Sequence, residues 1–161
     1  MTSPSPSPDP NRPKAADQAA LYDAVATEHA AIYGYGMVSA HSLPTRNELI
    51  SEALAQHRDH REAAVALLTG RGVTVPVPAA GYALPMVVAS PTDAAKLAVR
   101  MEGDCAVAWR AVLEQAREGA GGEQDRALGL TALTQCAVMA ARWRKVLGAW
   151  PVTEAFPGGG E

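Results

Sequence analysis

One Pro- and Gly-rich stretch in the middle of the chain constrains the fold more than any other feature. Residues 70–91 hold four prolines and three glycines, so this stretch cannot form a helix. Long segments without proline lie on both sides of it. A connection of about 20 residues is too long for a simple turn in a compact domain, so we expect it to cross over the folded chain.

The flanking segments predict four long helices, two before the connection and two after it. Thr45 and Glu48 have the spacing of a capping box, and Ser90 is well placed to cap the third helix. The expected helices are 14–41, 45–69, 91–118 and 123–147. The links between them are short, long and short, which predicts an all-α, ferritin-like four-helix bundle with one long crossover between the second and third helices.

The ends of the chain have a different composition from the middle. Residues 1–13 consist largely of Ser, Pro, Asp and Asn, so we expect this segment to be disordered. Residues 14–150 are expected to form the bundle, because 161 residues suit a single domain. Residues 151–161 contain Pro157 and three glycines and are expected to form an extended tail.

Composition excludes several classes of protein. The chain has 33 alanines and one phenylalanine, which favours closely packed helices over strands. Its net charge of −3 argues against a nucleic-acid partner. No apolar run is long enough to cross a membrane, and the first ten residues lack the apolar segment of a signal peptide. We therefore expect a cytoplasmic protein in which Cys105 and Cys136 are buried, reduced thiols; the alternative is a disulfide between them if their helices pair.

Polar residues interrupt the apolar stripes on the inner faces of the predicted helices. These residues are Glu28, His57, His60, Arg61, Glu102, Gln135 and Arg142. Counting outward from the two short links places Glu28 level with the two histidines, and Glu102 level with the region of Arg142. A buried carboxylate costs several kcal/mol unless it is paired or bound to a metal, so these residues must serve one another or a ligand.

Two interpretations of this group remain open. In the first, two carboxylates and two imidazoles bind one iron, manganese or zinc ion. The ligands would then be Glu28, His57, His60 and Glu102. In the second, the group is a satisfied cluster of ion pairs and hydrogen bonds, in which Arg61 or Arg142 neutralises the glutamates.

Several separated motifs resemble a known family. They are EHAAIYGYG at 28–36, HRDHR at 57–61, GYALP at 81–85, MEGDCAVAWR at 101–110 and PVTEAFPG at 151–158. Together they resemble the actinobacterial ferritin-like proteins of unknown function that are labelled DUF4439. The resemblance spans residues 15–158 and implies a ferritin-like bundle that forms a homodimer and has no assigned activity.

The wider group of ferritin-like di-iron proteins provides a pattern against which the residues can be matched. Its members carry Glu on one helix of each pair and Glu-x-x-His on the other. Glu28 and Glu102 match the two single glutamates, and His60 matches one histidine. His57 stands where the adjacent glutamate belongs, and the fourth helix has no Glu-x-x-His. The resemblance therefore implies that a complete di-iron site has been lost.

These observations favour a binding or scaffold protein whose partner is a small molecule or another protein. The alternative is a mononuclear metal-binding oxidoreductase or a metal-storage protein that uses the Glu/His group. A further alternative is a small-molecule pocket beneath the long connection, gated by Tyr82.

Overall fold

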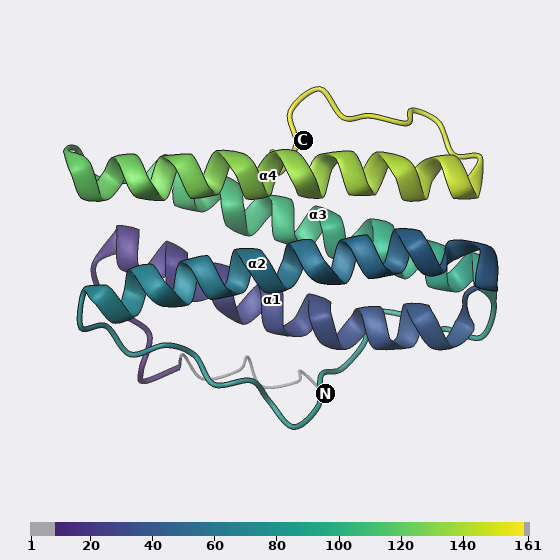
Figure 1. The fold of residues 1–161 in the computed structure, drawn as a ribbon, viewed down its shortest axis with the longest axis horizontal. Coiled ribbons are helices and arrows are strands. Elements are labelled where there is room, and N and C mark those ends of the chain that lie inside the picture. Colours follow the sequence, from purple (N-terminus) through teal and green to yellow (C-terminus); the bar gives the residue numbers. More distant parts are fainter. Residues whose placement is uncertain (1–8, 160–161) are drawn as a thin grey trace, which may run out of the picture.

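The computed structural model describes residues 9–159, and in that range four long helices form a bundle (Figure 1). The helices are α1 (Ala16–His41), α2 (Asn47–Gly70), α3 (Pro91–Gln115) and α4 (Ala120–Leu147). The predicted all-α four-helix bundle is confirmed. No strand occurs among the described residues.

The long connection, residues 71–90, runs back along the bundle beside α1 (Figure 1). It returns the chain to the end where α2 began, so α3 runs in the same direction as α2. Two contacts hold the connection against α1. The ring of His29 lies 3.3 Å from the Pro76 carbonyl oxygen, and the Tyr33 and Tyr82 rings are 5.4 Å apart. The predicted crossover is therefore present.

The start of α3 agrees with the sequence, whereas the start of α2 does not. The Asp93 amide donates to the Ser90 hydroxyl oxygen at 3.1 Å, and the same hydroxyl donates to the Asp93 carboxylate at 2.7 Å. The predicted capping box at Thr45 and Glu48 is wrong. Pro44–Arg46 forms a short 3-10 turn instead, and no side chain caps the first turn of α2.

The turn between α3 and α4 lies three residues earlier in the chain than expected. Helix α3 ends at Gln115, and α4 begins at Ala120, three residues before the predicted start at 123. Gly119 makes the turn with a φ of +85°. A Cβ atom on Gly122 would lie 1.6 Å from the Arg117 carbonyl oxygen. The glycines therefore allow the helix to begin against the preceding backbone rather than keeping it from forming.

The described parts of both chain ends contact the bundle. Asp9 accepts a hydrogen bond from the Tyr22 hydroxyl at 2.6 Å, and Arg12 pairs with Asp23 at 2.6 Å. At the other end, the backbone at Gly158 lies against α3. Residues 1–8 of the expected N-terminal segment and residues 160–161 of the expected tail lie outside the described range.

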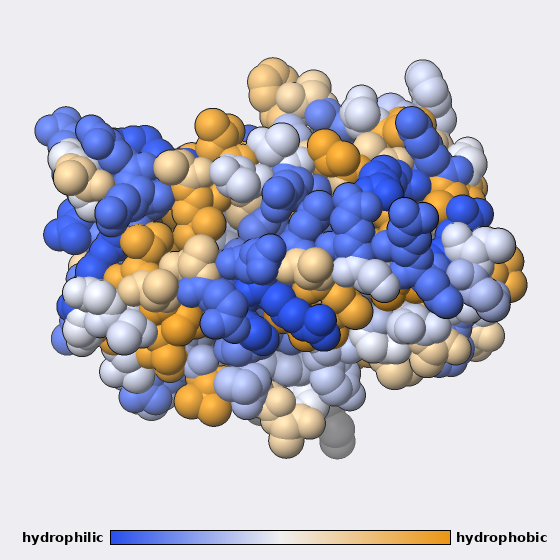
Figure 2. Space-filling model, viewed as in Figure 1, coloured by the Kyte–Doolittle hydropathy of each residue, from blue (hydrophilic) through white to orange (hydrophobic). Residues whose placement is uncertain are grey.

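The apolar core has two parts, with a polar layer between them. One part surrounds Leu21, Leu68 and Trp109, and the other surrounds Leu97 and Trp143. Buried alanines on every helix let the backbones approach closely. The outer surface is different: hydrophilic side chains cover much of the middle of the face in Figure 2.

Candidate functional site

Glu28 on α1 is the centre of the polar layer and is fully buried. One carboxylate oxygen, Oε2, lies 2.6 Å from Nδ1 of His57 on α2. The other, Oε1, accepts a hydrogen bond of 2.6 Å from the indole Nε1 of Trp109 on α3. Burial raises the pKa of Glu28, but its hydrogen bond with His57 and its ion pair with His60 outweigh this effect and lower it. Glu28 is therefore a carboxylate held charged in the core.

His57 links Glu28 to the second buried glutamate. Its other ring nitrogen, Nε2, lies 3.1 Å from Oε1 of Glu102 on α3. Burial lowers the pKa of His57, but the hydrogen bonds to Glu102 and Glu28 raise it to about 11. Both ring nitrogens therefore carry protons and donate to carboxylates, and His57 is an imidazolium between two anions.

The chain of hydrogen bonds continues beyond Glu102. The Tyr35 hydroxyl donates to Oε1 of Glu102, and the Trp143 indole donates to the Tyr35 oxygen at 3.0 Å. Burial, together with the nearby Glu102 carboxylate, raises the pKa of Tyr35 well above its usual value. Tyr35 therefore stays protonated, and this side of the polar layer is closed by neutral donors.

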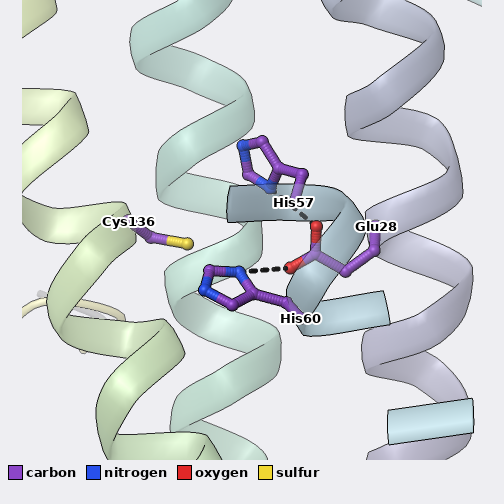
Figure 3. A group of neighbouring side chains, drawn as sticks. All are labelled: Glu28, His57, His60 and Cys136. Carbon is purple, nitrogen blue, oxygen red and sulfur yellow. Dashed lines mark hydrogen bonds and ion pairs between the residues drawn. The ribbon is translucent and has the colours of Figure 1, made fainter. Parts of the chain in front are cut away.

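His60 lies on the other side of Glu28, one helical turn from His57 (Figure 3). Its Nε2 is 2.5 Å from the side-chain oxygen of Gln135 on α4. Its Nδ1 faces Oε1 of Glu28 at 3.3 Å, but it has no hydrogen-bond partner. Burial lowers the pKa of His60, whereas contacts with Cys136 and Glu28 raise it to about 10.

Cys136 completes a compact group of metal-type donors. Donor atoms of Glu28, His57, His60 and Cys136 all lie within 4.8 Å of one another, and all four residues are buried. They come from α1, α2 and α4 (Figure 3). Glu102 is outside this group, because it lies on the far side of His57. The structure therefore brings together three of the four predicted ligands and adds a thiol.

The predicted place of the two arginines is wrong. Arg61 points outward and pairs with Glu62 at 2.6 Å, with a quarter of its side chain exposed. Arg142 pairs with Glu52 at 2.6 Å, with 39% of its side chain exposed. The histidines, rather than arginines, supply the positive charge for the glutamates. Gln135, by contrast, contacts the group through His60.

The sequence prediction also missed four members of the polar layer. They are Tyr35, Trp109, Cys136 and Trp143. The signal for the two tryptophans was available, since a buried indole N–H usually has an acceptor. The prediction that both cysteines are buried and free is confirmed. Cys105 is a neighbour of Cys136, and this contact together with burial raises the pKa of the Cys105 thiol well above its ordinary value.

Comparison with known proteins now identifies the family. The family model described as "Domain of unknown function (DUF4439)" matches residues 20–161. The chain belongs to the DUF4439 family. A protein of known crystal structure, the conserved hypothetical protein rv2844 from Mycobacterium tuberculosis, is 59% identical in sequence to this chain. That similarity covers 88% of this chain and 97% of that one, with a TM-score of 0.78. No curated protein matches.

The family description gives no specific function for this helical bundle. Within residues 9–159, none of the helices combines the length and apolar character that a bilayer span requires. What the protein does must therefore be argued from its own residues.

Proposed function

We propose that this DUF4439 protein is a ferritin-like bundle that acts as a binding protein rather than as an oxidase. The observation that carries the proposal is a pocket of about 450 Å³ beneath the crossover. Ala30 and Met101 line it from the helices, and Tyr82, Leu84 and Pro85 cover it from the crossover. This volume lies in the range of small-molecule sites. The mostly apolar lining favours a small, largely apolar molecule.

The residues do not fit a di-iron centre. Such a centre uses four glutamates and two histidines, and only Glu28, Glu102 and His60 match the pattern. The two glutamates are already bonded to the His57 imidazolium, a cation that occupies the place of a metal ligand. For the same reason, a mononuclear oxidoreductase that uses all four predicted ligands has less support than a binding role.

A binding assay with a pocket-filling variant tests the main proposal. The probe is Nile red, a neutral apolar dye, with its fluorescence titrated against purified protein. Ala30→Trp fills the pocket, and Ala55→Trp adds the same side chain at an exposed position of α2. We expect saturable binding to the wild type and to Ala55→Trp, with at least a tenfold loss in Ala30→Trp. Equal binding by all three proteins, or by none, would contradict the proposal.

Oxygen consumption tests the second half of the proposal. With two equivalents of Fe²⁺ per chain, the rate should equal that of buffer, and a ferritin should give a fast phase as the positive control. A fast phase from this protein would refute the absence of an oxidase centre.

We infer that the protein is a cytoplasmic homodimer. Two aromatic side chains at and just before the tail support a homodimer. Trp150 and Phe156 are 88% and 79% exposed, and such side chains are typical of interface anchors. Two free cysteines side by side suit a reducing compartment. Sedimentation equilibrium should give twice the chain mass for the wild type and the chain mass for a Trp150→Ser/Phe156→Ser variant.

A further inference from the structure

One buried nitrogen in the polar layer makes no hydrogen bond and faces a carboxylate only across a longer ion pair. His60 is 3% exposed, and its Nδ1 makes no hydrogen bond. Gln135 presents its side-chain oxygen to Nε2, so Nε2 carries the ring proton in the neutral form. Nδ1 then carries a lone pair, which faces the carboxylate oxygen Oε1 of Glu28 at an N–O distance of 3.3 Å. Two acceptors at this distance repel one another unless a positive charge lies between them. In the metal-free protein a proton on His60 supplies this charge, in line with the raised pKa of the ring, and a bound metal ion would replace that proton.

A third donor lies near the space between His60 Nδ1 and Glu28 Oε1. The Cys136 sulfur comes from α4 and lies within 4.8 Å of the donor atoms of Glu28 and His60. Figure 3 shows the three side chains converging from different helices. A carboxylate, an imidazole and a thiolate form a mixed donor set that suits zinc better than iron or manganese, because the thiolate is a soft ligand.

The spacing fits a tetrahedral ion. Two ligands bound at about 2.0–2.1 Å with tetrahedral angles lie roughly 3.3 Å apart. The separation of His60 Nδ1 from Glu28 Oε1 is 3.3 Å. Outer hydrogen bonds that orient zinc ligands are also in place: Trp109 donates to Glu28, and Gln135 accepts from His60.

We propose that Glu28, His60 and Cys136 bind one Zn²⁺ ion. His57 is not a ligand, because both of its nitrogens are bonded to carboxylates, and Glu102 is the partner of His57 rather than of the ion. The two charges of the ion are balanced by Glu28 and the Cys136 thiolate, and the His57 imidazolium is balanced by Glu102. The layer therefore remains neutral with the ion bound.

This site differs from a di-iron centre and from the metal site that the sequence predicted. It replaces Glu102 and His57 with a thiolate from the fourth helix. None of its three ligands lines the pocket beneath the crossover, so either proposal can fail alone.

A pair of cysteine variants tests the assignment. Chelator-treated protein is titrated with Co²⁺, which gives an intense near-ultraviolet band when a thiolate binds it, and then with Zn²⁺ as competitor. We expect one ion per chain in the wild type. Cys136→Ser should remove the band and weaken Zn²⁺ binding at least about 100-fold. Cys105→Ser changes the neighbouring buried thiol and should retain both the Co²⁺ band and the affinity for Zn²⁺.

A third variant probes the outer hydrogen bond. Gln135→Leu leaves all three ligands in place but removes the group that orients His60, so we expect about tenfold weaker binding. Circular dichroism confirms that each variant is folded. The assignment is overturned if the wild type binds neither ion, if Cys136→Ser keeps the band, or if the two cysteine variants lose binding equally.

Discussion

Replacing Glu28 with glutamine should remove a large part of the stability of the bundle. The carboxylate has one oxygen 2.6 Å from His57 Nδ1 and the other 2.6 Å from Trp109 Nε1. Glutamine has the same shape but only one acceptor oxygen, so in either orientation its NH₂ group faces a donor. A buried donor without a partner costs about 1–3 kcal/mol.

The charge lost in Glu28→Gln sets the larger cost, which already includes the unpaired donor because both fall on the His57 ring. The His57 imidazolium keeps only Glu102 as a partner, and breaking a buried ion pair costs about 3–5 kcal/mol. We therefore expect the free energy of unfolding to fall by about 3–5 kcal/mol. The free energy of unfolding of a typical domain is only about 5–15 kcal/mol in total. Such a loss should be plain in urea unfolding followed by circular dichroism, with chelator present so that metal binding does not contribute.

Glu52→Gln is the matched control. Glu52 also lies inside a helix and pairs with an arginine, Arg142, at 2.6 Å, but 43% of its side chain is exposed. Its replacement should cost less than about 1 kcal/mol. The free energies of unfolding of the two variants are compared at equal m-values. If they differ by less than about 1 kcal/mol, Glu28 is not the buried, charged acceptor described above.

Three further predictions concern other parts of the bundle. The pKa of His57 is raised from 6.5 to about 11, so the stability it contributes is complete below pH 6.5 and is lost as pH rises towards 11. Urea midpoints should fall more steeply over this range in the wild type than in His57→Gln, and equal slopes would contradict the charge assignment. A Cβ on Gly34 would lie 2.1 Å from the Met101 sulfur, whereas one on Gly36 meets nothing within 4 Å. Gly34→Ala should therefore lower the unfolding free energy by about 1–3 kcal/mol and Gly36→Ala should raise it by up to about 1 kcal/mol, so changes of the same sign would refute this packing. Ser90→Ala should cost about 1 kcal/mol in a thermal melt, and no change would mean that the cap of α3 contributes nothing.

The sequence was sufficient to predict the four helices and the position along the bundle axis at which the polar residues meet. Proline and glycine end helices for local reasons, so the crossover and the four helical segments could be read directly. Glu28, His57 and His60 were placed together because both helices could be counted outward from one short link. That counting depends only on the helical rise, which varies little.

The sequence was not sufficient for the orientation of α4. Its expected inner stripe contained Gln135 and Arg142, whereas the buried residues are Cys136 and Trp143. One residue corresponds to a rotation of about 100° around the helix axis. In α4 the alanines provide little contrast between the faces, so a stripe displaced by one residue looked equally apolar. The same ambiguity on α2 placed Arg61 inside beside His60.

The hydrogen-bonded polar layer also limits which substitutions the protein can accept during evolution. Glu28 has contacts on α2 and α3, and His57 joins it to Glu102. Exchanging the whole group for apolar residues of equal volume is often harmless or even stabilising, but removing one member leaves an unpaired charge in the core. Because substitutions arise one at a time, every route to an apolar core passes through an unstable ancestor. Descendants could thus inherit this layer long after its first use had ended.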